Sequence, residues 1–295
     1  MFKTVLLTAM TSFVSVAGIH PQEVSTGSSI ALFTGLMNYQ GDLKPNSFTF
    51  QHSNFTVALT VRKPVNRWFT VRTGFTMGRI EAADRYNRDY LKNRNLSFFS
   101  SIHDLHAGLE LSLLDITTKR VTPYFYGGLA VFWFNPWTFD NSGKKVFLKP
   151  LGTEGQGLSE YPKQRPYSLT QLAIPFGTGI RYAVSEWVTI GVEFSQRKSF
   201  TDYIDDVSTH YVNPEALLLA RGSKAVEMAY RTDEIRGANP DYPAPGEQRG
   251  TPSEMDWYYF FGTTVEIKFK RIARYFQSRD PYRRSYQQRC PRRVL

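Results

Sequence analysis

The sequence predicts an all-β chain, an eight-stranded antiparallel transmembrane β-barrel of the OmpA type with long extracellular loops and a basic C-terminal tail. Eight segments alternate between apolar and polar or small residues, and the connections between them alternate between long and short. Aromatic residues are frequent, with 17 Tyr, 22 Phe and 5 Trp among 295 residues. Successive side chains of a strand point to opposite faces, so each segment has one apolar and one polar face. An outer-membrane barrel turns the apolar face to lipid and the polar face to its lumen.

The clearest alternation belongs to a hairpin at residues 169–200. In its first strand Leu172, Ile174 and Ile180 share the apolar face, and glycines and Arg181 lie opposite. After a short turn at residues 184–186, the alternation resumes from Val188. A soluble β-sandwich would bury the apolar face of such a hairpin against a second sheet, so the rest of the chain must decide between the two folds.

Six further strands are predicted, in order, and the alternation of the first is the least clear. They cover about residues 29–39, 54–63, 68–81, 99–114, 121–134 and 257–269. A tilted membrane strand needs about 9–11 residues, and strands of soluble proteins are usually about five or six. The predicted lengths therefore favour the membrane barrel.

The connections support the same fold. The short ones are residues 64–67, 115–120 and 184–186, and the long ones are 41–53, 82–97, 135–168 and 203–255. Outer-membrane barrels have short periplasmic turns and longer extracellular loops. An even number of strands would place both termini of the chain on the periplasmic side.

The last long loop contains helix signals. Asn213, Pro214 and Glu215 are suitable as the N-cap, first position and first-turn acid of a short helix through Ala220. After an interruption at residues 222–223, a second helix is expected over 224–231, and residues 237–254 are expected to be irregular because they are rich in Pro and Gly.

The first 17 residues resemble a secretory signal peptide. Lys3 supplies the positive charge, residues 5–16 are moderately apolar, and residues 15–17 form a small-x-small cleavage site. The following chain has no run of about 20 apolar residues that would form a membrane helix, and its mean hydropathy is −0.36. We therefore expect a signal peptide at 1–17, a barrel at 28–269 in the outer membrane of a Gram-negative bacterium, in contact with its lipids, and a periplasmic tail at 270–295.

The positive charge is concentrated in that tail. Of the net charge of +10, +8 lies in residues 270–295, so the body of the protein is not of the basic, nucleic-acid-binding kind. The tail could dock on an acidic partner protein or an anionic envelope polymer, or it could lack a specific role. Its candidate interaction residues are Arg283, Arg284, Arg292, Arg293 and Cys290, the single cysteine, which could form an intermolecular disulfide.

The sequence offers little for catalysis, and we expect neither an enzyme nor a cofactor. His103 and His106 project to opposite faces of one strand, so they cannot share a metal. Ser195 lacks a Gly-x-Ser-x-Gly motif. Asp202, Asp205 and Asp206 are weak candidates for calcium ligands, because their spacing is not that of an EF-hand loop. The alternative for these three is a set of solvated loop acids near the lipid headgroups.

Charged residues of mixed sign fall on the predicted lumen faces. They are Arg62, Arg72, Asp104, Glu110, Arg181, Glu193, Arg197, Glu266 and Lys268. An eight-stranded barrel is only wide enough to be filled by its own side chains, and buried charges require partners. These residues are therefore expected to form an ion-pair network that fills the lumen, and a small-solute pore is the alternative.

Four stretches resemble the DUF6089 family of Bacteroidetes outer-membrane barrel proteins. They are residues 38–43 (NYQGDL), 134–138 (FNPWT), 194–208 and 250–258 (GTPSEMDWY). The resemblance extends over about residues 28–269. The family is similar to PorG, an outer-membrane component of the type IX secretion system. The resemblance therefore implies protein transport and association with a periplasmic ring of the PorK lipoprotein and PorN. It brings no catalytic residues, and a surface-loop adhesin or structural barrel is the alternative.

Overall fold

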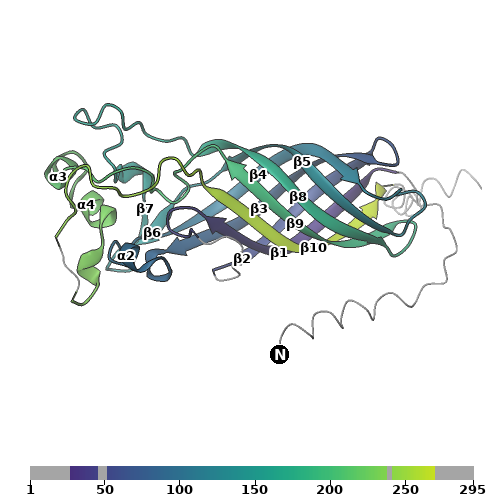
Figure 1. Ribbon diagram of the computed structural model, residues 1–295, viewed down its shortest axis with the longest axis horizontal. Helices are drawn as coiled ribbons and strands as arrows, with labels where there is room; N and C mark the ends of the chain where they lie inside the picture. Colours follow the sequence, from purple (N-terminus) through teal and green to yellow (C-terminus); the bar gives the residue numbers. More distant parts are fainter. Residues whose placement is uncertain (1–26, 46–51, 238–240, 270–295) are drawn as a thin grey trace, which may run out of the picture.

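A computed structural model describes residues 27–45, 52–237 and 241–269, and its eight long strands form an antiparallel barrel (Figure 1). The strands are β1 Ser29–Gln40, β2 Asn54–Pro64, β3 Phe69–Ala83, β4 Ser97–Ser112, β5 Val121–Trp133, β8 Thr170–Ala183, β9 Val188–Ser199 and β10 Trp257–Lys268. The predicted eight-stranded barrel is confirmed. The predicted signal peptide and basic tail, including Arg283, Arg284, Cys290, Arg292 and Arg293, lie outside the described residues.

The barrel closes because the last strand pairs with the first. Each long strand pairs with its neighbour in the chain, with β5 next to β8, and β10 pairs with β1 from Ser29↔Lys268 to Gln40↔Trp257. Closure leaves no long strand with an unpaired edge, so every ladder of backbone hydrogen bonds is used within the barrel.

The two ends of the barrel differ. Short connections join the strands at one end, and the long loops form a cap at the other (Figure 1). The cap holds α2 Asp89–Lys92, α3 Pro214–Arg221, α4 Ser223–Ala229 and three short 3₁₀ segments, Asp84–Tyr86, Lys149–Leu151 and Thr232–Glu234. Among the described residues, no helix is long and apolar enough to cross a membrane.

The predicted helix cap at Asn213 is confirmed, since its side chain accepts hydrogen bonds from the backbone N–H groups of Glu215 and Ala216. The expected second helix is present as α4, which begins one residue earlier than expected, at Ser223, and ends two residues earlier, at Ala229. Sequence reasoning missed α2 and a small hairpin in the loop at 135–168, formed by β6 Trp137–Phe139 and β7 Lys145–Phe147. Asp140 accepts backbone hydrogen bonds from Ser142 and Lys144 in the hairpin's turn, so an Asp-x-Ser-Gly signal was present.

A belt of exposed apolar side chains surrounds the barrel. On β4, Leu105, Leu109 and Leu111 are 51, 55 and 41 % exposed, and Leu129 on β5 is 72 % exposed. Equivalent residues project from the other long strands, including Phe55, Phe75, Ile180 and Val265. A soluble monomer rarely exposes so large a continuous apolar surface, whereas a barrel in lipid requires one.

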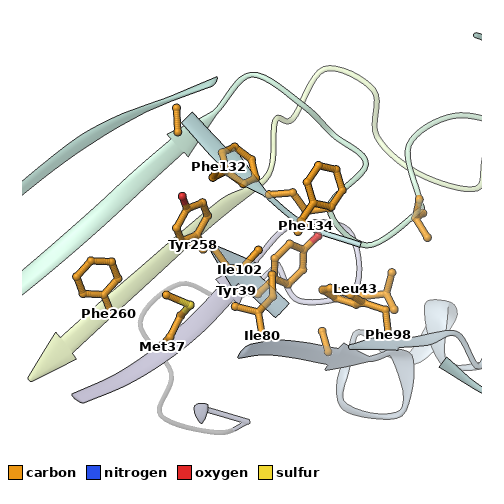
Figure 2. Close-up of a cluster of buried hydrophobic side chains, with 14 of the residues drawn as sticks. Met37, Tyr39, Leu43, Ile80, Phe98, Ile102, Phe132, Phe134, Tyr258 and Phe260 are labelled. Carbon is orange, nitrogen blue, oxygen red and sulfur yellow. The ribbon is translucent and has the colours of Figure 1, made fainter. Parts of the chain in front are cut away.

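The interior is layered. Charged residues fill the half of the barrel with short connections. An aromatic cluster, drawn in Figure 2, fills the capped end. In this cluster Phe132 packs against Tyr258, with ring centroids 5.3 Å apart, and Tyr39 packs edge-on against Phe98 at 4.9 Å. The apolar layer therefore separates the charged lumen from the polar cap.

Replacing a belt leucine with arginine is expected to be costly only where lipid surrounds it. Leu109→Arg, near the middle of the apolar stretch of β4, should reduce the free energy of unfolding by about 2–4 kcal/mol, measured by urea-induced unfolding in vesicles. The control is Leu219→Arg on α3, where the leucine is 89 % exposed outside the belt. This change should stay within about 0.5 kcal/mol of the wild type. Equal, small effects at both sites would contradict a lipid-facing belt.

Candidate functional site: the charged lumen and its cap

Four arginines and four carboxylates meet inside the barrel. Because they occupy alternate positions on six strands, the pleat turns all of them inward. They are Arg62, Arg72, Arg181, Arg197, Asp104, Glu110, Glu193 and Glu266, and none is more than 8 % exposed. The equal numbers of opposite charges make this set electrically balanced.

Glu193 on β9 is the centre of the larger group. Its two oxygens lie 3.0 and 3.1 Å from the Nη2 and Nη1 atoms of Arg72, and its Oε2 lies 3.1 Å from Nη2 of Arg62. The hydroxyl of Tyr124 donates to the same Oε2 at 2.6 Å. Such a bidentate, charge-assisted arrangement fixes both guanidinium groups in position.

Two further carboxylates complete this group. Glu266 Oε2 lies 2.8 Å from Nη1 of Arg62, and Glu110 lies 2.7 Å from Nη1 of Arg181 and 3.2 Å from Nε of Arg62. Every arginine in the group thus contacts a carboxylate from another strand. The contacts cross-link β2, β3, β4, β8, β9 and β10 through the lumen.

A smaller group lies nearer the cap. Arg197 Nε donates to Asp104 Oδ2 at 2.9 Å, and Tyr258 donates to the same oxygen at 2.8 Å. His106 Nδ1 is 2.8 Å from Asp104 Oδ1, while His103 is exposed on the outer face near Phe75. The two histidines therefore lie on opposite faces of β4, as predicted.

Sequence reasoning missed the tyrosines that join the two groups. Tyr126 donates to Ser195, which also accepts from Arg197, and the Tyr126 ring lies 3.8 Å from the guanidinium of Arg72. Gly177 and Gly179 point inward from β8 and make room for the rings of Tyr126 and Tyr124. A Cβ at Gly179, for example, would lie 2.5 Å from the Tyr124 hydroxyl oxygen. Two features of the sequence could have identified these tyrosines: the alternation along β5, which turns Tyr124 and Tyr126 inward, and the glycines on the neighbouring strand β8.

The lumen ends at a small cavity on the side with short connections. This cavity, of about 50 Å³, is bordered by Arg62, Arg181, Glu266 and Lys268. Among the described residues, the Lys268 ammonium has no hydrogen-bond partner. It therefore lies at the edge of the network, outside its ion pairs.

Asp202, Asp205 and Asp206 are buried beneath the cap, at most 4 % exposed. The alternative expectation of solvated loop acids was therefore wrong, because the loops fold over the barrel end and exclude water from these carboxyl groups. Hydrogen-bond donors replace the water at Asp205 and Asp206, whereas among the described residues the two buried oxygens of Asp202 have no hydrogen-bond partner. Asp205 Oδ2 accepts from Tyr39 at 2.7 Å, and Asp206 accepts from Thr153 at 2.6 Å. In the described part of the chain, no group of three or more His, Cys, Asp or Glu side chains is arranged to hold a metal ion.

The Tyr39 hydroxyl lies between two carboxyl groups, 2.7 Å from Asp205 Oδ2 and 2.6 Å from Asp256 Oδ1. One hydroxyl hydrogen cannot serve both contacts, so a carboxyl proton completes the arrangement. Burial, with the neighbouring Asp42, raises the pKa of Asp205 to about 8. Burial and the nearby Asp205 raise the pKa of Asp202 to about 9.

Two buried ion pairs stabilise the loops of the cap. Arg249 lies 2.8 Å from Glu154, whose oxygens also accept from the backbone N–H groups of Ser208 and Thr209. Arg94 lies 2.7 Å from Asp84 in the β3–β4 connection. Glu154 and Arg249 are 95 residues apart in sequence, so no local motif identified their pair. Asp84 and Arg94 are ten residues apart within one connection.

Comparison with known proteins identifies a family match in the N-terminal part. Residues 4–149 match the family described as "Domain of unknown function (DUF6089)". No curated protein matches the chain.

The solved structures found are barrels of low sequence identity. The chain is similar to Neisserial surface protein A, with 10 % identity, a TM-score of 0.40, and coverage of 82 % of this chain and 97 % of that one. It is similar to OprG from Pseudomonas aeruginosa, with 12 % identity, a TM-score of 0.38 and coverage of 84 % and 100 %. For Ail of Yersinia pestis the values are 8 % identity, a TM-score of 0.36, and 82 % and 100 % coverage.

Removing the central carboxylate should destabilise the barrel strongly. Glu193→Gln leaves Arg62 and Arg72 without their shared partner, and breaking a buried pair in this way typically costs about 3–5 kcal/mol. The measurement is the free energy of unfolding in vesicles. The control is Glu227→Gln, which removes the surface partner of Lys224 and should cost less than about 1 kcal/mol. A loss below 1 kcal/mol at Glu193 would contradict its central role.

The cap should be more stable in acid than in alkali. The folded pKa of Asp205 is about 8, above the value of about 3.9 in an unfolded chain. The folded state therefore binds more protons between these values, and the cap loses stability as pH rises from about 4 to 8. Amide hydrogen exchange at Leu43 and Val207, corrected for the intrinsic rate, should show greater protection at pH 5 than at pH 9.

Asp205→Asn should flatten this dependence, because it removes one of the titrating carboxyl groups. Asp89→Asn is the matched control, since Asp89 lies on the surface beside Lys92 and the variant should keep the wild-type pH dependence. Greater protection at pH 9 than at pH 5 would overturn the assignment.

Proposed function

We propose that this protein is a non-enzymatic β-barrel of the Gram-negative outer membrane with a closed lumen, acting as an anchor for the type IX secretion machinery. The observation that carries the proposal is the inversion of the usual protein arrangement. Apolar side chains are exposed around the barrel, and a balanced set of charges is buried inside it. Such a molecule is suited to lipid on the outside and requires little water within.

The closed lumen is favoured over a solute pore by the ion pairs. A selective pore uses a ring of like charges around an open path, whereas here each arginine is joined to carboxylates across the lumen. The aromatic cluster that includes Phe132 and Tyr258 (Figure 2) fills the lumen next to these pairs, and Tyr258 donates to Asp104 of the smaller group. An ion that crosses the lumen would therefore have to break the ion pairs and also displace the aromatic side chains.

Planar-bilayer recordings test this closure. The full-length protein should show no steady conductance. Arg72→Ala/Glu193→Ala, which removes one cation and one anion and leaves a void, should produce intermittent openings. Lys224→Ala/Glu227→Ala removes a charged pair from the cap surface and should stay closed. A steady open channel in the wild type would favour the small-solute pore.

The secretion role is supported by the match of residues 4–149 to the DUF6089 family, which is similar to PorG. With the lumen occupied, the periplasmic turns and the sequence beyond β10 are the surfaces through which such a barrel would contact ring proteins of the PorK and PorN kind. The turns carry exposed cations, including Arg67 and Lys119, which suit an acidic partner.

Affinity purification from native outer membranes tests the partner. Under non-reducing conditions, the full-length protein should capture PorK- and PorN-like proteins, and a chain ending at Phe269 should capture less because it lacks the arginines at 283, 284, 292 and 293. Cys290→Ser is the control that separates charge from disulfide formation. Capture of no ring protein by any variant would contradict the secretion role and favour a surface-loop adhesin.

A further inference from the structure

The outer face of the barrel changes from apolar to charged at one level of β3 and β4. Outward positions on β3 are Phe75 and Met77, followed by Arg79, and on β4 the apolar series ends at Leu105, with His103 beyond it. Arg79 is thus the first charged side chain above the lipid belt. If the barrel spans the outer membrane, as proposed above, Arg79 lies at the headgroup layer of the outer leaflet.

Four aromatic side chains cluster beside this level. Phe99 of β4 stacks on Trp137 of β6 with centroids 4.7 Å apart, and Phe139 packs edge-on against both. The β6–β7 hairpin lies at the capped end (Figure 1) and continues the sheet from β4. Phe139 and Phe147 are 45 and 42 % exposed, so the cluster forms part of the outer surface.

Two cations are held on these rings. The guanidinium of Arg79 lies 5.1 Å from the Phe99 centroid and 5.0 Å from that of Trp137. The ammonium of Lys145 lies 4.2 Å from the Trp137 centroid and 4.7 Å from that of Phe147. Cation–π contacts position both groups without neutralising them, so an anion nearby would meet two fixed positive charges.

Two of the three surrounding acids are paired with other cations, and the third contacts a histidine ring. Glu81 is 3.4 Å from His52, Asp140 is 3.0 Å from Lys224, and Glu234 is 2.6 Å from Arg231. Within the described ranges, neither Arg79 nor Lys145 forms an ion pair with a carboxylate. The local positive charge is therefore available to an external ligand.

An open groove of about 620 Å³ borders the same rings. Phe99 and Phe139 lie on its wall together with Asn95, Ser97 and Asn141, and the wall also includes the three acids named above and the cations Arg85 and Arg231. Aromatic faces next to amide and hydroxyl groups suit a sugar, which has apolar C–H faces and polar edges. The groove and the two cations thus offer complementary contacts for one ligand that carries both a sugar and a phosphate.

We propose that this rim binds the phosphorylated sugar headgroup of an outer-leaflet glycolipid. The phosphate lies between Arg79 and Lys145, the sugar lies against Phe99 and Phe139, and the acyl chains continue along the belt past Met77. Charge complementarity and continuity with the lipid-facing surface favour this occupant over a soluble anion. The inference rests on the proposed membrane insertion.

The test is lipid binding by the full-length protein in an uncharged detergent, followed by native mass spectrometry. The probes are lipid A with both phosphates and the same lipid A after removal of its phosphates. The wild type should bind the phosphorylated form preferentially. Arg79→Gln/Lys145→Gln should weaken that binding by about tenfold, because two charge-assisted contacts are lost.

The matched control is Arg67→Gln/Lys198→Gln, which removes the same charge. Arg67 and Lys198 each lie over a single tryptophan, Trp68 and Trp257, at other positions on the barrel. This variant should bind as the wild type does. Equal losses in the two double variants would overturn the site in favour of general electrostatic attraction, and equal binding of dephosphorylated lipid A would overturn phosphate recognition.

Flotation with phosphatidylcholine vesicles separates this inference from the proposed function. A wild type that inserts into vesicles but shows no phosphate preference overturns only the glycolipid site. A wild type that fails to insert overturns the membrane assignment itself. Normal insertion of both double variants would show that a loss of lipid A binding does not arise from misfolding.

Discussion

The pairing of Glu193 with Arg62 and Arg72 is the interaction on which the rest of this structure depends. Eight strands enclose too little space for hydrated charges, so each inward arginine needs a carboxylate from another strand. Glu193 supplies two such contacts and accepts from Tyr124 as well. Because these contacts cross the lumen, they hold opposite walls of the barrel at a fixed separation that the backbone ladders alone do not specify.

Filling the lumen directs any interaction to the outside of the barrel. The short turns, the apolar belt and the capped end remain as surfaces, and each has a different chemistry. The belt is apolar, the turns carry cations such as Arg67, and the rim at Arg79 and Lys145 combines cations with aromatic rings. The proposed role as an outer-membrane anchor would use these surfaces separately, the belt for lipid and the turns for a partner protein.

The cap follows a different electrostatic principle from the lumen. In the lumen, carboxylates are matched by arginines, whereas Asp202 and Asp205 lie close together with raised pKa values. Tyrosine hydroxyls and backbone N–H groups supply part of the compensation, and protons supply the remainder. The loops are therefore joined to the barrel by groups whose charge depends on pH, while arginine stays charged throughout the physiological range.

The sequence by itself determined the barrel, because alternation has a period of two and each strand repeats it over ten or more residues. It also placed Arg72 and Glu193 on inward faces, and Asn213 at a helix start, since these follow from local geometry. Which arginine meets which carboxylate was decided only by the tertiary structure, because the register and closure of the barrel set those distances. The burial of Asp205 was decided by loops that fold back across long separations in sequence, and the position of Lys145 over Trp137 was decided by the pairing of β6 with β7.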